Sequence, residues 1–465
     1  MTGSEATETG GRQYASRAGI TAWLLFDWAA QPYFTLITTF VFAPYFAARV
    51  APDPVAGQAL WGYATGAAGL AIAFLSPILG AIADAAGARK RWIAAFSLLL
   101  ILGAGTLWFA APGIPSAITI ALIGYVLAAL GAEFATTFTN AMMPDLVPEE
   151  NLGRLSGTGW AIGYAGGLLS LVIVLGLFVA NPESGRTLFG LSPVLGLDPA
   201  RFEGDRASGP FTALWYLVFV LPLFVFTPDT PRQMPLRMAA GFGIARLGAT
   251  LRSLRGHANV ATFLLAHMIY ADGLVALFAF GGIYAAGIFG WGSFELGLFG
   301  ILLTVTGTLG ALVGGRLDDR LGPKPVIIGT LAILILASIG ILSVDRDSLF
   351  FVLPVEPPAG TEGLFSTLSE KIYLGLGALI GAVAGPLQSA SRSLMARIAP
   401  RRRTTEFFGL YALAGKVTSF AGPILVGLVT AFSGSQRIGI SVLVAFFAIG
   451  GLLLLRVIPR RSVQS

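Results

Sequence analysis

Long apolar stretches alternate with short polar segments along the whole chain. A bilayer core needs roughly 20 apolar residues per helical span, and these stretches reach that length repeatedly. Because they stay apolar on every side of a helix, they fit lipid better than the core of a water-soluble protein. The pattern predicts an all-α membrane protein with twelve spans, at 20–48, 58–83, 91–111, 117–143, 155–180, 211–228, 259–288, 294–317, 325–344, 369–398, 406–432 and 437–457.

Composition supports lipid as the solvent of most side chains. Of the 465 residues, 55% are hydrophobic and only 12% are charged, about half the charge of a typical soluble domain. The 60 glycines suit helices that approach each other closely in a membrane. With no cysteine and two histidines, the chain lacks disulfides, thiolate chemistry and the usual spacing of metal ligands. We expect no cofactor and no metal.

One long polar break divides the spans into two groups of six. The first apolar stretch is too long, and carries Asp27 too early, for a cleavable signal peptide. We therefore interpret it as the first span and expect the polar segments 181–210 and 345–368 on the opposite side from the break. The predicted organisation is a tail 1–19, a six-helix bundle 20–228, a linker 229–258, a second bundle 259–458 and a tail 459–465.

Basic residues predict the orientation. About 21 of the 30 Lys and Arg fall in segments on the side of the linker, and about 7 fall in the opposite loops. This bias places both termini in the cytoplasm. It also explains the net charge of +6 as an orientation signal, so we expect no nucleic-acid partner.

A short motif recurs at the same place in each half, after the second and the eighth spans. Both copies read G-x-x-x-D-x-x-G-x-[RK], and paired halves of this kind are how many secondary transporters build a central site. A looser echo relates Pro148, Gly157 and Gly163 to Pro400, Gly409 and Gly415. The motif residues that we expect to control gating are Gly80, Asp84, Gly87, Arg89, Lys90, Gly315, Asp319 and Gly322.

The first copy of this motif, with its Arg-Lys-Arg run, resembles the signature loop of the major facilitator superfamily. The resemblance implies a major facilitator fold of two pseudo-symmetric six-helix bundles that opens alternately to each side. It implies that Gly80 permits close helix approach. It also implies that Asp84 hydrogen-bonds near a positive helix N-terminus.

Further stretches are similar to the vacuole-effluxer, or unknown-major-facilitator, branch of that superfamily. They include Trp23–Ala29, Phe138–Pro144, Gly159–Gly167, Asp272-Gly273 and the long stretch from Gln388 to Pro423. The resemblance implies amino acids as possible solutes, as for the fungal members of the branch. Ala30 and Gln31 stand where the branch usually has Asn-Ser, which puts inherited specificity in question.

Ionisable residues inside the predicted spans are the sharpest functional signal. Such a residue costs several kcal/mol in lipid unless it is paired or wetted. They cluster in the first, fourth, seventh, tenth and eleventh spans, at Asp27, Glu133, His267, Asp272, Arg392 and Lys416. In the superfamily the first four of these helices line the central cavity. We hypothesise that the two basic residues are partly neutralised by Asp27 and Glu133, and that one partner is exchanged for solute or proton. The alternative is that the pairs only hold the two halves together.

Polar neighbours extend this candidate site. Gln31 lies one turn from Asp27, Asn140 shares a face with Glu133, and Gln388 precedes Arg392 by one turn. Tyr164 lies one turn after Trp160, where the two rings form either a wall for solute or ordinary core packing. Pro386 is a possible flex point in the tenth span.

These observations favour a secondary transporter of a small, carboxylate-bearing solute that works by alternating access. No phosphate-binding G-x-x-x-x-G-K-[ST] loop is present, so we expect a gradient, proton rather than sodium, to supply the energy. A membrane enzyme lacks the required residues. A transport-inactive receptor or scaffold on the same fold is the remaining alternative. We expect a monomer in a bacterial inner (plasma) membrane.

Overall fold

The computed structural model describes residues 8–458 except 10–11, 53, 181–183, 254–257, 290, 292, 356–364 and 420. Parts of the predicted tails, linker and loops, including residues 1–7 and 459–465, therefore lie outside the described residues. The chain divides into two compact units, each described by itself. Unit 1 comprises residues 1–148, 162–248 and 400–412, and unit 2 comprises 149–161, 249–399 and 413–465.

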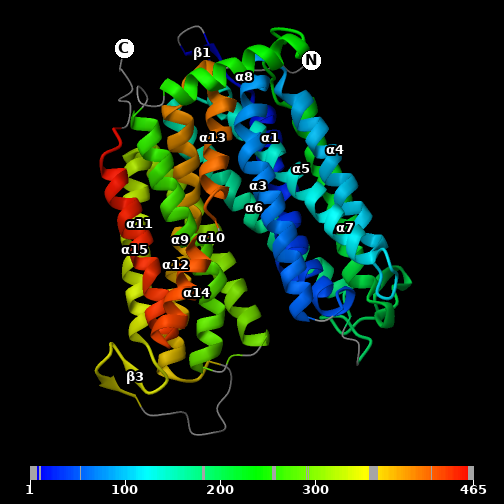
Figure 1. Ribbon diagram of the computed structural model, residues 1–465, viewed down its shortest axis with the longest axis vertical. Helices are drawn as coiled ribbons and strands as arrows, with labels where there is room; N and C mark the ends of the chain where they lie inside the picture. Colours follow the sequence, from blue (N-terminus) through cyan, green and yellow to red (C-terminus); the bar gives the residue numbers. More distant parts are fainter. Residues whose placement is uncertain are drawn as a thin grey trace. The chain divides into compact units, whose positions relative to one another are not determined.

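Unit 1 contains the first half of the helices and the start of α13 (Figure 1). Its helices are α1 (Arg17–Pro32), α2 (Phe42–Tyr45), α3 (Pro54–Ala86), α4 (Arg89–Thr106), α5 (Ala117–Leu146), most of α6 (Leu152–Ile173), α7 (Glu203–Phe226), most of α8 (Leu236–Ser253) and most of α13 (Thr404–Lys416). A two-residue hairpin, β1 (Glu8–Thr9) and β2 (Arg12–Gln13), precedes α1.

Unit 2 contains the start of α6 and most of the second half of the chain. Its helices are α9 (Ala258–Phe289), α10 (Ser293–Leu321), α11 (Pro323–Ser343), α12 (Leu368–Ile398), the end of α13, α14 (Ala421–Ser433) and α15 (Gln436–Leu455). A small antiparallel hairpin, β3 (Ser348–Leu349) and β4 (Leu353–Pro354), follows α11.

The two units repeat one packing scheme, as the recurring motif suggests. In unit 1, α4 packs on α5 and α7, α1 on α7, and α3 on α5. In unit 2, α11 packs on α12 and α15, α9 on α15, and α10 on α12. Each pair in one unit has its counterpart in the other, so the sequence repeat is also a structural repeat.

In the described part of the chain, twelve helical stretches are long and apolar enough to cross a membrane, which confirms the predicted all-α membrane architecture. The sixth begins at Glu203, eight residues before the predicted start. The hydropathy pattern missed this turn because it is polar. It forms because Arg206 pairs with Glu203 at 3.3 Å and donates to the Trp108 carbonyl at 3.0 Å.

The polar break between the sixth and seventh spans contains an unpredicted helix, α8. It lies across the end of α3 (Figure 1), where Ala239 is buried with Ile82 and Ala85. Gly243 allows the approach, because a Cβ there would lie 2.9 Å from the carbonyl oxygen of Ala81. Its sequence mixes basic and small residues, so it lacks the long apolar run by which the spans were found.

Several spans are not continuous α-helices; the fifth, for example, ends in a π-helix at Val174–Phe178. The first changes to π-helix at Tyr33–Phe40 and again at Phe46–Val50; π-helical segments often occur at functional sites. The eleventh stops as α13 at Lys416 and resumes as α14 at Ala421.

Candidate functional site

The first motif carboxylate, Asp84, caps the first turn of α13. Its two oxygens accept hydrogen bonds from the backbone N–H groups of Thr405 at 3.1 Å and Glu406 at 2.8 Å. Helix N-termini carry unpaired N–H groups and a partial positive charge, so a carboxylate there is stabilised. Asp84, Thr405 and Glu406 are all buried. We call this contact the first cap; it joins the second span to the eleventh within unit 1.

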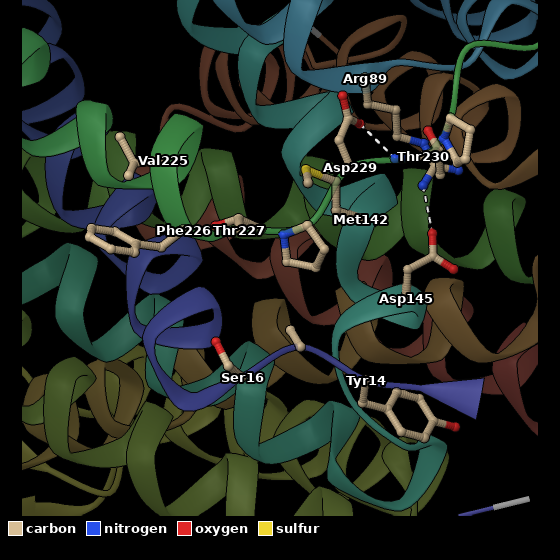
Figure 2. A pocket seen from close by; sticks show the side chains of 13 residues that line it. Tyr14, Ser16, Arg89, Met142, Asp145, Val225, Phe226, Thr227, Asp229 and Thr230 are labelled. Atoms are coloured by element: carbon tan, nitrogen blue, oxygen red, sulfur yellow. Dashed lines mark hydrogen bonds and ion pairs between the residues drawn. The ribbon is translucent and has the colours of Figure 1, made fainter. Parts of the chain in front are cut away.

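Arg89 adds further hydrogen bonds and an ion pair around the first cap. Its guanidinium donates to the Thr405 hydroxyl at 3.0 Å and to Asp145 at 2.8 Å, and lies 3.5 Å from Asp84. Figure 2 shows Arg89 and Asp145 beside a cavity of about 580 Å³ at this end of unit 1. The arginine thereby links the ends of α3 and α5 to the start of α13.

Two glycines make room for the first cap. A Cβ on Gly80 would lie 2.5 Å from the carbonyl oxygen of Thr405, so a side chain there would push α13 away. Gly87 has φ +69°, which favours glycine, and any Cβ would strike the Pro231 carbonyl. Lys90 donates to the Phe224 carbonyl at 3.0 Å, which ties the motif loop to the end of α7.

The second motif carboxylate repeats this arrangement in unit 2. Asp319 accepts from the backbone N–H of Arg154, in the first turn of α6, at 2.9 Å. The Arg154 side chain also lies 3.5 Å from Asp319, although that side chain is 65% exposed. We call this contact the second cap; it joins the eighth span to the fifth. Gly315 again permits the approach, because its Cβ would lie 2.8 Å from the Gly153 carbonyl oxygen. Gly322 ends the motif at φ +83°.

A second ion pair supports the second cap. Asp318, only 1% exposed, pairs with Arg397 on α12 at 3.0 Å. With the repeat offset of Pro148 and Pro400, Arg397 occupies the position of Asp145 in the first half. A base therefore stands in the second half where the first half has an acid, and its partner Asp318 lies on α10, next to the motif carboxylate.

Arg392 on α12 is buried and binds the start of α6. Its Nε donates to the Ser156 hydroxyl at 2.8 Å and its Nη2 to the Ser156 carbonyl at 2.6 Å. The Ser156 hydroxyl in turn donates to the Ser389 carbonyl at 2.7 Å. The guanidinium also lies 5.8 Å from the ring centroid of Trp160. The predicted neutralisation of Arg392 by Asp27 or Glu133 stays a prediction.

In unit 1, the candidate residues of α1 lie against a glycine face of α6. The Cβ of Asp27 and the Oε1 of Gln31 each lie 3.5 Å from the Cβ position of Gly163. A Cβ on Gly167 would lie 2.7 Å from Gln31. The structure therefore brings Asp27 and Gln31 together, half-buried, beside the part of α6 that carries Tyr164.

The other candidate residues lie on the helices predicted for them. Glu133 is half-buried on α5, where its carbonyl accepts from the Thr137 hydroxyl, and Asn140 is buried two turns further on. In unit 2, Asp272 is buried on α9. The remaining candidates are Gln388, half-buried on α12 one turn before Arg392, and Lys416, half-buried at the end of α13.

Comparison with known proteins identifies the family. Residues 150–465, more than half of the chain, match the family model described as "Vacuole effluxer Atg22 like". The chain belongs to this family. The vacuole effluxer family accounts for the paired motifs and for the sequence stretches noted above, and it makes the chain a transporter of the major facilitator type rather than an enzyme.

Proteins similar to this chain occur in bacteria and fungi. The chain is 25% identical over 448 residues to the "Uncharacterized MFS-type transporter YxiO" of Bacillus subtilis, covering 95% of each chain. It is 26% identical to "Autophagy-related protein 22" of Coccidioides immitis, over 61% of this chain and 45% of that one. The chain thus spans about half the length of this fungal relative.

Solved structures confirm the fold. The transporter FucP in the outward conformation matches with a TM-score of 0.68 at 16% identity, covering 94% of this chain and 97% of that one. The proton:xylose symporter XylE matches with a TM-score of 0.69 at 15% identity, covering 96% of each. At these identities the likeness shows the major facilitator fold alone.

Several residues that support the two caps and Arg392 were not predicted from the sequence. Asp145, Arg397 and Asp318 end their spans and look like ordinary interfacial charges, and Ser156 is one serine among many. A usable signal existed: aligning the halves on Pro148 and Pro400 places an acid opposite a base at Asp145 and Arg397.

Proposed function

We propose that the chain moves a small, carboxylate-bearing solute across a membrane by alternating access, driven by protons. One observation carries the proposal: each motif carboxylate caps a span from the other half of the chain. Asp84 holds the eleventh span, and Asp319 holds the fifth. Hydrogen-bonded contacts of this kind form in one state and break in the other, so they can bias a two-state motion.

The charges of the two units support the class of solute. Unit 1 carries the acids Asp27 and Glu133 within its spans, whereas unit 2 carries the bases Arg392 and Lys416 together with the acid Asp272. A base within a span favours a carboxylate, and an acid within a span favours a proton or an ammonium group. Amino acids carry both groups. This supports amino acids as the first solutes to test.

The basic bias of the segments on the linker side supports a cytoplasmic location for both termini. A relative in Bacillus subtilis supports the plasma membrane of a bacterium. We propose that the monomer is the working unit, because each cap is complete within one chain.

Counterflow in proteoliposomes tests the function. Vesicles loaded with one unlabelled amino acid at a time should accumulate the same labelled amino acid transiently if it is a solute. An Arg392→Gln variant should lose this exchange, because a neutral amide replaces the guanidinium. The matched control Arg346→Gln alters an exposed loop arginine and should leave exchange unchanged. Absence of counterflow and of thermal stabilisation for every amino acid, organic acid and sugar would favour a transport-inactive scaffold.

A further inference from the structure

The eleventh span is interrupted within the membrane. Between α13 and α14 the chain makes a turn, in which the N–H of Ser419 donates to the Lys416 carbonyl at 3.3 Å and that of Ala421 to the Thr418 carbonyl at 2.7 Å. Non-helical backbone is tolerated at membrane depth only where it is buried in protein or lines a watery cavity. In secondary transporters, interrupted helices of this kind hold substrate and coupling ions.

Helix α9 runs alongside this interruption. A Cβ on Gly415, just before the break, would lie 3.5 Å from His267, and one on Gly422, just after it, would lie 2.6 Å from the Asp272 carbonyl oxygen. The depths agree as well. At about 1.5 Å per residue, Asp272 lies about 21 Å from the start of α9, and the break begins about 18 Å from the start of α13.

Asp272 is a buried acid whose backbone lies next to this break. The residue is 3% exposed, and its Oδ1 has no hydrogen-bond partner among the described residues. A buried carboxylate without full hydrogen bonding is costly, and the cost is much lower when the group takes a proton. The site therefore has two states of different charge.

Few charged or titratable residues lie on the elements around this break. On α9 itself they are His267 and Tyr270, and Tyr270 bonds to Ser391 of α12 at 2.7 Å, next to Arg392. At the break, α13 ends in the cationic Lys416. Within the described residues α14 has no ionisable side chain, and α15 has only Arg437 in its first turn.

We propose that Asp272 is the proton-binding group that couples the proton gradient to the motion of α13. This rests on the proposed function. A proton from water binds the carboxylate in one state and leaves it for water in the other, with no other bond changed. Deprotonation creates a negative charge beside the end of α13 that carries Lys416, while the opposite end of the same helix is held by the first cap. The negative charge left by proton loss at Asp272 thus attracts the Lys416 end of α13, the helix whose other end the first cap must release.

A solute-independent experiment follows from the absence of native cysteine. Ser76 on α3 is 1% exposed, and its carbonyl lies against Gly409 of α13. A thiol at this position becomes accessible only when α13 moves away from α3, so Ser76→Cys reports that separation. The full-length protein in liposomes is labelled with maleimide across a pH series. Each rate is divided by that of Asp347→Cys, an exposed loop site, to remove the pH dependence of the thiol itself.

With Asp272 intact, the normalised rate should change with pH through one proton, up to about tenfold per pH unit. Asp272→Asn should abolish the pH dependence, and the matched control His267→Gln should keep it. An unchanged pH dependence in Asp272→Asn, or a flat profile in the parent, would overturn the proposal. Should Asp272→Asn fail to fold, Asp272→Glu decides: a displaced midpoint supports the assignment, and an unchanged one refutes it.

Exchange of K⁺ for Na⁺ at fixed pH should leave the rate unchanged, and a response to Na⁺ would refute the proton assignment. The counterflow assay is independent of these readouts. Missing counterflow with an intact pH response of Ser76→Cys would reject the proposed solutes only. Intact counterflow with a pH response that survives in Asp272→Asn would reject this inference only.

Discussion

The two motif caps use the same carboxylate position in different surroundings. In the first cap, Asp84 bonds two buried N–H groups, and Arg89 adds bonds to Thr405 and Asp145. In the second, Asp319 bonds one backbone N–H together with the exposed side chain of Arg154. The buried ion pair there belongs to Asp318 and Arg397 instead. The helix cap is therefore repeated in both halves, whereas the supporting ion pair is built from different positions in each half.

This difference suggests an unequal division of strength. The first cap concentrates its charge in one buried network, so its loss should be felt most. The second cap is supported by the buried pair of Asp318 with Arg397 and by the exposed Arg154 side chain beside Asp319, so each support can be removed separately. The following predictions are ordered from the largest expected effect to the smallest.

Asp84→Ala should have the largest effect. It leaves two buried N–H groups of α13 without an acceptor and removes a partner of Arg89, at a cost of about 3 kcal/mol, or roughly a hundredfold in an equilibrium. Maleimide labelling of Ser76→Cys should accelerate by a similar factor. The control Asp198→Ala removes an exposed carboxylate, 4.0 Å from Arg201, and should leave the rate unchanged. Equal rates in Asp84→Ala and the control would refute the first cap.

Asp318→Ala should open the second unit less strongly. It leaves the mostly buried Arg397 without its ion-pair partner, although Arg397 can still turn toward Asp319. We therefore expect the closed arrangement to lose about 2 kcal/mol of stability. Labelling of Ser389→Cys, a buried site whose carbonyl bonds Ser156, should rise by roughly tenfold or more. The control Asp345→Ala breaks the exposed pair with Arg437 and should change little. A rise as large as that in Asp84→Ala would remove the proposed difference between the caps.

Arg154→Ala should have the smallest effect. Its side chain is 65% exposed, and exposed ion pairs contribute about 0–1 kcal/mol. The backbone N–H that Asp319 accepts remains in place. Labelling of Ser389→Cys should therefore change less than about fivefold, whereas Asp319→Asn in the same background should exceed it. The reverse order would show that the side chain, not the helix cap, holds Asp319.

The sequence alone predicts the membrane architecture because lipid imposes one simple rule on every span. It also predicts the residues of both motifs, because the repeat places them at equal positions. It does not predict the partners. The pairing of Asp318 with Arg397 and of Arg392 with Ser156 depends on how helices distant in sequence pack, and no local pattern records that.

Local departures from the predicted helix bounds could not be predicted from the sequence either. The sequence predicts the eleventh span as one continuous stretch, because the polar residues Lys416, Thr418 and Ser419 do not by themselves show that the helix stops at Lys416. The sixth span starts early because polar Arg206 finds partners on Trp108 and Glu203. Both departures arise from tertiary contacts that override the local pattern, and both fall where charged groups enter the membrane region.

The most direct test of the account is the distance between α13 and the end of α3. Arg91, in the first turn of α4 just after the end of α3, and Arg402, just before α13, are exposed. Spin labels on Arg91→Cys and Arg402→Cys can be measured by pulsed electron resonance in lipid nanodiscs. The account predicts two distance populations, with Asp84→Ala shifting the protein toward the longer one. A single distance, unchanged by Asp84→Ala, would contradict it.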